Sequence, residues 1–303
     1  MSLVDIVIPA HNAEKTLFRA VKSCFRQKKI SSNDINVIVI DDSSIDGTVN
    51  IAESIKKIYP MKLLRLHQNS GPAAARNAGI NKTRSKYVAF LDADDEMHSE
   101  RLSIQLQVLY NNPEIGFVIS GIRERHGKGV RVIVRKTPTT QIDFFHQVFV
   151  GNLRSLIPTF TIDRKCMIET LKGFDERLNY LEDREFILRA IHYIGGLYLP
   201  VALVDRWIQS EGLTEKAPVE IIEASRKKFI TIVNEWYKPS PALKRRFWAM
   251  TYSGIASKLA RSGSVSLAVC YALRSLMNYP SFRSLFWIRH LMIFLSRSIR
   301  RAI

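Results

Sequence analysis

The sequence has few cysteines and lacks the two common phosphate-binding loops. Its three cysteines, Cys24, Cys166 and Cys270, are odd in number, far apart and outside any metal-ligand spacing. We therefore expect reduced thiols in a cytoplasmic protein. No GxGxxG and no GxxxxGK[ST] occurs in the chain, which excludes the usual dinucleotide fingerprint and the P-loop as nucleotide sites.

Long apolar runs are also missing. No stretch reaches the roughly 18 uncharged residues that a membrane-spanning helix needs. The opening segment MSLVDIVIPAHN contains no basic residues, and Asp5 interrupts its short apolar run, so we expect no signal peptide and no secretion. The seven histidines show no metal-ligand spacing. An apolar fraction of 46% over 303 residues is typical of a folded globular protein.

Acidic residues are nearly absent from the last quarter of the chain. From Arg226 to the end there are 15 Lys or Arg and one acid, Glu235, so this part carries +14 of the net charge of +17. The rest of the chain is nearly neutral. This uneven charge predicts two regions with different roles, a globular body and a basic, aromatic-rich C-terminal region.

Within the body, apolar runs alternate with amphipathic segments. The patterns predict strands at 4–10, 35–41, 61–67 and 87–92, and helices at 14–26, 48–59, 72–82 and 99–111. Such alternation indicates an α/β fold with a doubly wound, mainly parallel sheet. Ligands of open sheets of this kind bind beyond the carboxyl ends of the strands.

Polar residues follow each of the four predicted strands, and we expect them to face one crevice: His11 and Asn12, Asp41 and Asp42, Asn69, and Asp92 and Asp94. The fourth strand ends in three carboxylates within four positions, because Asp95 follows directly. Two like charges about 4 Å apart repel by roughly 4 kcal/mol at an effective dielectric constant near 20. The cluster therefore requires a compensating positive charge, which could come from a metal ion, an arginine or a helix N-terminus. A divalent cation here could hold the diphosphate of a nucleotide sugar.

Six segments in fixed order resemble a known family: VDIVIPAHNAEKTL, VIVIDDSSIDGT, NSGPAAARNAGI, YVAFLDADD, GFDERL and LEDREFILRA. They resemble glycosyltransferase family 2, the inverting GT-A nucleotide-sugar transferases, over roughly residues 3–215. The resemblance implies a Rossmann-like GT-A fold with a C-terminal helical extension. We expect a catalytic domain at 1–220, with a nucleotide-sugar half at about 1–120 and an acceptor half at about 121–220. Residues 221–303 are expected to form a basic, amphipathic helical region.

The resemblance also implies roles for individual residues. The nucleotide-sugar contacts would be Pro9, Ala10 and His11 at the pocket wall, Asp41 at the uracil N3, Asn69 and Arg76 at the base, ribose or diphosphate, Arg206 at the diphosphate, and the DxD motif Asp92-Ala93-Asp94. Asp92 would lie near the ribose and sugar, and Asp94 would bind Mn²⁺ or Mg²⁺. Asp183 corresponds to the general base and Glu182 to its adjacent acid. The late Arg-x-x-His pattern of the family reads RWIQ here, so Gln209 replaces the histidine.

These roles agree with the chemistry of sugar transfer. A nucleoside diphosphate leaves when its developing charge is stabilised, which a metal ion does as a Lewis acid. The acceptor hydroxyl is a poor nucleophile, so a carboxylate within hydrogen-bond reach must take its proton. A single displacement would turn an α-linked donor into a β-linked product.

Each site residue also has a structural interpretation that the sequence leaves open. Asp41 and Asp42 could cap a loop, His11 could only pack, and Arg76 could simply pair with the acids. Glu182 and Asp183 could form a solvated first helical turn, where acids suit the helix dipole. The segment Asp46-Gly47-Thr48 is expected to form a turn and a helix cap rather than a ligand contact.

The sequence predicts further helices in the C-terminal region, interrupted near Gly263 and Pro280. One of them has an apolar stripe, with basic residues on the opposite side. The stripe consists of Leu285, Ile288, Met292, Leu295 and Ile299. A basic amphipathic helix with tryptophan predicts an anionic membrane surface as partner. The alternative is packing on the body or on a second copy of the chain as a homo-oligomer. Nucleic acid is not expected as a partner, because no binding motif occurs.

Together these observations predict a metal-dependent inverting glycosyltransferase on the inner face of the plasma membrane, cytoplasmic and peripheral. It would transfer from a UDP-sugar donor to a polyprenyl-diphosphate-linked glycan acceptor in O-antigen or exopolysaccharide synthesis. The alternative is a catalytically silent scaffold that binds nucleotide or carbohydrate in a synthesis complex. The intact DxD and Glu182-Asp183 pairs argue against that alternative.

Overall fold

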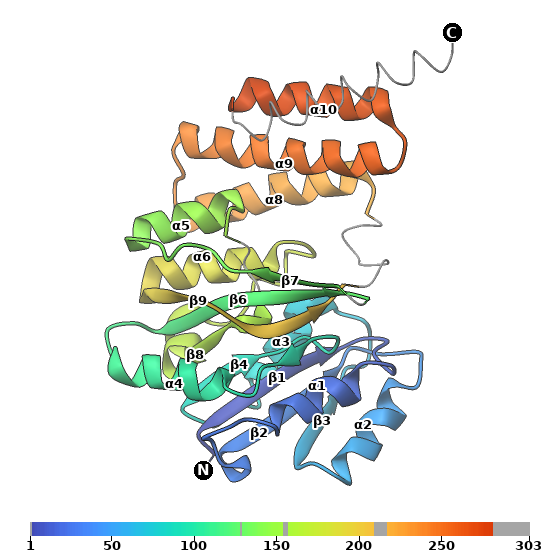
Figure 1. Ribbon diagram of the computed structural model, residues 1–303, viewed down its shortest axis with the longest axis vertical. Coiled ribbons are helices and arrows are strands. Elements are labelled where there is room, and N and C mark those ends of the chain that lie inside the picture. The colour runs from blue at the N-terminus through green and yellow to red at the C-terminus, as the bar shows by residue number, and fades with distance from the viewer. Residues whose placement is uncertain (1, 128, 154–156, 209–216, 281–303) are drawn as a thin grey trace. The chain divides into compact units, whose positions relative to one another are not determined.

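The computed structural model describes residues 2–127, 129–153, 157–208 and 217–280 (Figure 1). The chain forms two compact units. The first comprises Met1–Val148 with Arg154–Ser210, and the second comprises Phe149–Leu153 with Glu211–Ile303. The boundary expected from the sequence, between residues 220 and 221, lies shortly after Glu211, where the longer segment of the second unit begins.

The first unit contains one sheet and the helices that cover it (Figure 1). Its strands are β1 (Val4–Ala10), β2 (Ile35–Asp41), β3 (Met61–Arg65), β4 (Tyr87–Phe90), β5 (Glu96–Met97), β6 (Phe117–His126), β7 (Gly129–Ile133), β8 (Thr161–Asp163) and β9 (Gly196–Trp207). Its helices are α1 (Leu17–Cys24), α2 (Thr48–Lys56), α3 (Gly71–Ile80), α4 (Arg101–Asn111), α6 (Glu182–Ile194) and α5 (Gln141–Val150) up to Val148, with short turns at Ser32–Asp34, Ile157–Thr159 and Cys166–Leu171.

The strand order is β3-β2-β1-β4-β8-β6-β9-β5, and β7 pairs with β6. Strands β1 to β4 are parallel to one another, with Val4 opposite both Ile35 and Tyr87. Strand β8 is antiparallel to β4 and to β6, whereas β6 and β9 are parallel. The α/β fold with a mainly parallel sheet is confirmed, and the antiparallel β8 joins its two halves.

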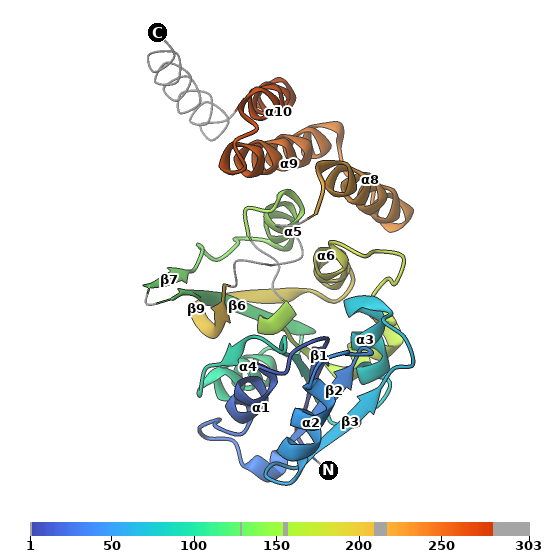
Figure 2. The same cartoon turned by 90° about the vertical axis from the view of Figure 1, so that its right-hand side faces the viewer.

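The two faces of the sheet are covered by different helices (Figure 2). Val4, Ile6 and Ile8 of β1 belong to a core cluster with buried residues of α1, α2 and α4. The intervening side chain of Val7 points to the other face, where α3 packs. A Cβ added at Gly79 of α3 would lie 2.6 Å from both Val7 and Ile40. Glycine at this position therefore allows α3 to approach the sheet closely.

The first residue of α4, Arg101, is completely buried. Its guanidinium donates to the carbonyl oxygens of Phe90 at 3.0 Å and Phe160 at 3.1 Å, and its Nε donates to Gln105 at 3.0 Å. Burial lowers the pKa of Arg101 to about 9, and the nearby Asp95 carboxylate opposes this. Arg101 thus fixes the end of β4, from which the DxD segment continues.

The predicted elements are confirmed in kind, but several end earlier than the patterns indicated. Strand β4 ends at Phe90 instead of residue 92 because the chain then turns, with the Asp95 N–H donating to the Asp92 carbonyl at 3.1 Å. Asp46 accepts from the N–H and hydroxyl of Thr48 at the start of α2. The segment therefore forms the expected turn, and the Asp46 side chain satisfies the N–H of the first residue of α2.

The described part of the second unit is helical, with α8 (Val219–Trp236), α9 (Pro241–Arg261) and α10 (Val265–Asn278). Helix α9 begins at a cap in which Ser240 accepts from the Leu243 N–H, followed by Pro241. The rings of Phe149, Phe229 and Phe247 pack with centroids 5.3–6.0 Å apart. Among the described residues, no helix has both the length and the apolar composition that crossing a bilayer requires. The predicted stripe from Leu285 to Ile299 lies outside the described residues.

Candidate functional site

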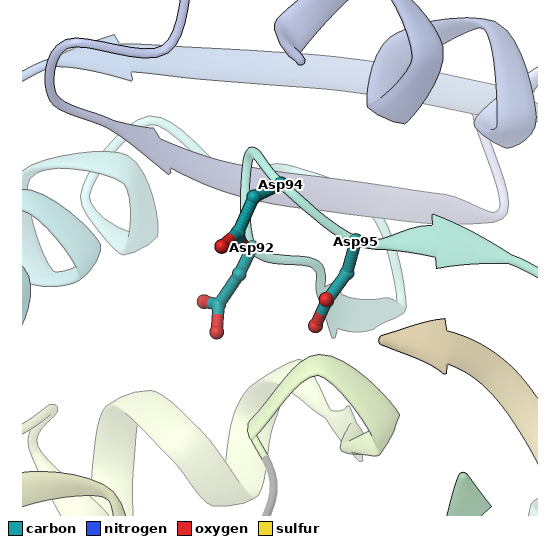
Figure 3. Close-up of side chains that lie close together, drawn as sticks. All are labelled: Asp92, Asp94 and Asp95. Atoms are coloured by element: carbon teal, nitrogen blue, oxygen red, sulfur yellow. The ribbon is translucent and has the colours of Figure 1, made fainter. Parts of the chain in front are cut away.

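Three aspartates of the turn between β4 and β5 lie close together (Figure 3). Asp92, Asp94 and Asp95 each place a carboxylate oxygen within 4.8 Å of the others, and Figure 3 shows the side chains pointing to the same side of the loop. Burial, followed by the charge of Asp92, raises the pKa of both Asp94 and Asp95, and Asp94 adds to the effect on Asp95. The charge of Arg206 acts against both shifts.

The acid trio, defined as Asp92, Asp94 and Asp95, fits a divalent cation. Oδ1 of Asp95 is buried and has no hydrogen-bond partner among the residues that the structure describes. A buried, unpaired carboxylate oxygen is costly unless a cation or donor satisfies it. Three hard oxygen ligands within 4.8 Å match the preference of Mn²⁺ and Mg²⁺ for carboxylates.

Arg76 of α3 connects the acid trio to α6. Its Nη2 donates to Asp92 and its Nη1 donates to Glu182, both at 3.0 Å. The side chain is only 7% exposed. Burial acts to lower the pKa of Arg76, but the charges of Asp92 and Glu182 outweigh it and raise the pKa above its usual range. The pairing of Arg76 with the acids is therefore observed, and its contact with a diphosphate stays a prediction.

The GFDERL segment places the start of α6 beside α3. Asn77 of α3 accepts from the Phe174 N–H at 2.8 Å and donates to the Phe174 carbonyl at 3.0 Å. Gly173 has φ of +86° and a Cβ there would lie 2.5 Å from Asn77 Oδ1, so both conformation and space require glycine. Arg189 of α6 donates to the carbonyl oxygens of Leu171 and Gly173, which ties the same loop to α6.

Glu182 and Asp183 form the first turn of α6, but the solvated interpretation of this turn is wrong for Glu182. Glu182 is buried and bonded to Arg76. Burial and the charge of Asp183 raise the pKa of Glu182 to about 7, against the lowering effect of Arg76. Asp183 is half-buried and accepts from the Arg184 N–H at 2.6 Å. Burial also raises the pKa of Asp183, while the charges of Arg184 and Arg76 oppose this. A carboxylate with a raised pKa is a stronger proton acceptor.

Glu182 should make the stability of the protein depend on pH. Its pKa is about 7 in the folded state against an ordinary value of 4.5, so the folded state binds a proton more readily than the unfolded state. The free energy of unfolding should therefore fall as pH rises from about 4.5 to about 7, by up to roughly 3 kcal/mol. Glu182→Gln should flatten this dependence, because glutamine keeps an acceptor for Arg76 without titrating.

Urea unfolding at pH 5 and pH 8 measures the effect. Glu169→Gln, a change of the same kind at an exposed position, should retain the pH dependence of the parent. If Glu182→Gln and Glu169→Gln lost stability equally between the two pH values, Glu182 would not be the titrating group.

At the ends of β1, β2 and β3, a second group of predicted residues comes together. His11 Nδ1 lies 2.8 Å from the Asp42 carbonyl, and Asn69 Nδ2 lies 3.1 Å from His11 Nε2. His11 is exposed, so the interpretation that it only packs is wrong. Pro9 and Ala10 end β1 beside Ile40 and Asp41 of β2.

Asp41 and Asp42 have different roles. The Asp42 carboxylate accepts from the N–H groups of Ser70 and Gly71 at 2.8 and 2.9 Å, which caps α3. Asp41 is completely buried, and its Oδ2 has no hydrogen-bond partner among the described residues. Arg65 Nε is 3.8 Å from that oxygen. Asp41 therefore retains a carboxylate oxygen without a hydrogen-bond donor, whereas each carboxylate oxygen of Asp42 already accepts an N–H.

The sequence-based site residues thus form two groups, one around His11, Asn69 and Asp41 and one around the acid trio with Arg76 and Glu182. Ala93 is buried between the acids of the DxD, and Arg206 acts on the trio by its charge. Sequence reasoning missed Arg19, whose Nη2 donates to the Asp94 carbonyl at 2.7 Å. No sequence signal identified it, because an arginine on an amphipathic helix usually faces solvent.

Comparison with known proteins supports the family resemblance that the sequence motifs indicated. The model of the family "Glycosyl transferase family 2" matches residues 5–169. The chain is 30% identical over 200 residues to the minor teichoic acid biosynthesis protein GgaA of Bacillus subtilis (strain 168). This alignment covers 61% of the chain and 42% of GgaA. The chain is 34% identical over 134 residues to the UDP-Glc:alpha-D-GlcNAc-diphosphoundecaprenol beta-1,3-glucosyltransferase WfaP of Escherichia coli, covering 40% of the chain and 51% of WfaP. The chain thus spans about half the length of these relatives.

The fold is also similar to that of a solved protein. The crystal structure of S. aureus TarS 1–349 aligns with a TM-score of 0.65 over 99% of this chain and 92% of TarS 1–349. At 18% sequence identity the likeness supports the fold alone. The family match includes the acid trio and Arg76 and covers more than half of the sequence: the chain belongs to glycosyl transferase family 2.

Proposed function

We propose that the protein is a metal-dependent inverting glycosyltransferase that transfers a sugar from a UDP-sugar to a hydroxyl group of a lipid-linked glycan. The observation that carries the proposal is the acid trio joined through Arg76 to Glu182. A candidate cation site thus lies beside the buried Glu182 and the half-buried Asp183, two carboxylates with raised pKa values. Perturbed pKa values next to a charge cluster are typical of catalytic sites.

The donor would bind along the ends of β1 to β4. The buried Oδ2 of Asp41, which has no hydrogen-bond partner among the described residues, offers an acceptor for the N3–H of uracil. Pro9, Ala10, His11 and Asn69 lie at the same edge of the sheet. The name of WfaP specifies UDP-Glc as its donor. A UDP-sugar is therefore the donor class that we propose for this chain.

Asp94 would hold the divalent ion, with Asp92 and Asp95 beside it. When bound, Mn²⁺ or Mg²⁺ supplies Lewis-acid stabilisation of the departing diphosphate. Arg206, whose charge acts on Asp94 and Asp95, would add positive charge near the diphosphate. Arg76 orients Asp92 through its bond at 3.0 Å.

Asp183 would take the proton of the acceptor hydroxyl as that oxygen attacks the anomeric carbon. Its raised pKa makes it a better base than an ordinary aspartate. Glu182 is held by Arg76, so the first turn of α6 keeps a fixed orientation toward the donor side. Attack opposite the leaving diphosphate inverts the anomeric centre.

The acceptor that we propose is a polyprenyl-diphosphate-linked glycan of a bacterial surface polysaccharide. GgaA is named for minor teichoic acid biosynthesis, and the acceptor in the name of WfaP is a diphosphoundecaprenol. A lipid-linked acceptor requires the enzyme to work at a membrane. The net charge of +14 from Arg226 to the end of the sequence suits the inner face of the plasma membrane, and a homo-oligomer through the C-terminal helices is the alternative use of that region.

A thermal-shift screen of nucleotide sugars with and without Mn²⁺ tests the proposal. We expect UDP and one UDP-sugar to raise the unfolding temperature only with the metal, because a ligand at about 100 times its Kd adds about 2.7 kcal/mol of stability. The stabilising donor should then release UDP with a lipid-linked acceptor. If UDP binds but no donor turns over with any acceptor, the silent scaffold replaces the enzyme, and if no nucleotide binds, the proposal is wrong.

Membrane docking gives a separate prediction. The full chain should sediment with vesicles containing anionic lipid and not with neutral vesicles, because each Lys or Arg near the surface contributes about 1 kcal/mol. Reversing two exposed charges of α8 in Lys227→Glu/Lys228→Glu should release it at moderate salt. The same reversal at exposed Lys56 and Lys57 serves as the control. Equal sedimentation of both variants would exclude docking through this part of α8.

A further inference from the structure

We propose that Arg19 is a positioning residue that, together with Trp207, holds the main chain of the acid trio in its metal-binding conformation. The inference rests on the proposed metal site. It concerns residues outside the DxD motif and outside the carboxylate pair of α6. It assigns a role to Arg19, which neither the sequence motifs nor the family match singles out.

Arg19 lies on α1 and reaches the turn between β4 and β5. Its Nη2 donates to the carbonyl oxygen of Asp94 at 2.7 Å. Its guanidinium carbon lies 4.4 Å from the centroid of the Trp207 ring, a distance typical of a cation–π contact. Arg19 therefore bonds the middle of the acid trio through the backbone and leaves the Asp94 carboxylate free.

Trp207 is the residue on which the Arg19 guanidinium packs. It ends β9, and β9 pairs with β5, the strand that continues directly from the acid trio, with Glu96 opposite Asp205. Arg19 thus joins the Asp94 backbone to Trp207 of β9, and the strand pairing of β5 joins the end of the acid trio to the same β9. The loop is therefore tied to β9 at two points, which restricts how it can rotate.

Trp207 is itself supported by the ion pairs of β6 and β9. The guanidinium of Arg125 lies 5.5 Å from the Trp207 ring centroid and donates to Asp205 at 2.7 Å. Asp205 also accepts from Arg123 at 2.5 Å. The support therefore consists of regular strands joined by ion pairs, and outer partners on such rigid elements are the ones that fix the orientation of metal ligands.

Charge and geometry predict opposite effects for Arg19. A cation next to a divalent-metal site repels the metal, so removal of the Arg19 charge should by Coulomb's law alone tighten metal binding. If Arg19 acts by positioning the Asp94 backbone, its removal should weaken metal binding. The sign of the change in Mn²⁺ affinity therefore separates the two roles.

The experiment measures Mn²⁺ binding by calorimetry in the presence of UDP. Arg19→Met keeps the aliphatic stem and removes the donor and the charge, and it should raise the Kd for Mn²⁺ by about 10-fold to 100-fold. Arg19→Lys keeps a charge and a donor and should recover part of the loss. Arg26→Gln removes an exposed charge just beyond α1 and should leave the Kd unchanged. Thermal unfolding of each variant without metal confirms that it is folded.

Trp207→Leu provides the second arm. Because Arg19 and Trp207 act on the same loop, the double variant Arg19→Met/Trp207→Leu should weaken Mn²⁺ binding by less than the product of the two single effects. A Kd for Arg19→Met equal to or below that of the parent would overturn the positioning role while leaving the proposed function intact. Failure of the unmodified protein to bind Mn²⁺ would overturn both.

Discussion

Replacing Asp183 with asparagine should abolish sugar transfer and leave donor binding intact. Asparagine has nearly the same shape but cannot accept the proton of the attacking hydroxyl, and loss of a general base typically costs a factor of about 10² to 10⁴ in rate. Among the described residues no hydrogen bond joins Asp183 to the acid trio, and its Oδ1 accepts from the Arg184 N–H. The Kd for UDP with Mn²⁺ should therefore stay at the value of the parent protein.

Two measurements separate this result from loss of folding. UDP release under single-turnover conditions gives the rate of transfer, and calorimetry gives the donor affinity. Asp34→Asn, a change of the same kind in the short turn at Ser32–Asp34, should keep the full rate. Transfer by Asp183→Asn at the parental rate would remove Asp183 from the role of base.

Asp94→Asn should have a comparably large effect, and it should act on metal and rate together. The proposed metal stabilises the leaving diphosphate through Asp94, and loss of such electrostatic stabilisation costs about 10² to 10³ in kcat. In the metal-free protein, the same substitution should change the folding stability. Burial and the charge of Asp92 raise the pKa of Asp94, so the ionised residue costs folding energy at neutral pH. Asp94→Asn should thus be more stable than the metal-free parent.

Titration with Mn²⁺ and thermal unfolding with a chelator measure the two effects. The parent should gain stability on metal addition, and Asp94→Asn should gain little. A variant that binds Mn²⁺ as tightly as the parent would show that Asp92 and Asp95 hold the ion without it. A variant less stable than the metal-free parent would show that Asp94 contributes to folding.

The first half of the fold followed directly from local patterns. Strands β1 and β2 have the bounds that the apolar runs VDIVIPA and INVIVID predicted. Both strands are buried on two faces, so nearly every residue is apolar and the polar residue that follows marks the end. Element ends were less accurate where turns intervened. Helix α1 begins at Leu17 because the Thr16 and Leu17 N–H groups first bond to the Ala13 carbonyl in a turn.

The second half could not be predicted in the same way. Strand β8 has three residues, and its antiparallel position between β4 and β6 depends on pairing across the chain. The bond between Arg76 and Glu182 joins residues 106 positions apart. No local periodicity encodes such a contact, and an acidic first helical turn has the same sequence whether it is buried or solvated.

The candidate site was predictable in its residues and not in their partners. The neighbouring acids Asp41 and Asp42 have identical side chains, and only the structure shows that Asp42 caps α3 while Asp41 keeps an unpaired oxygen. Arg101 and Arg19 carried no signal because arginine is usually exposed. Arg101 binds the main-chain carbonyl of Phe90, just before the acid trio, and Arg19 binds that of Asp94 within it.

The buried Arg101 has a consequence for protein engineering. Its partners come from the end of β4, from its own helix and from the Phe160 and Thr161 segment. A chimera that grafts the DxD loop alone onto a related scaffold would leave the recipient without the guanidinium that organises these carbonyls. Donor loops of this family should therefore be exchanged as one block that runs from β4 through α4 and includes the matching strand β8.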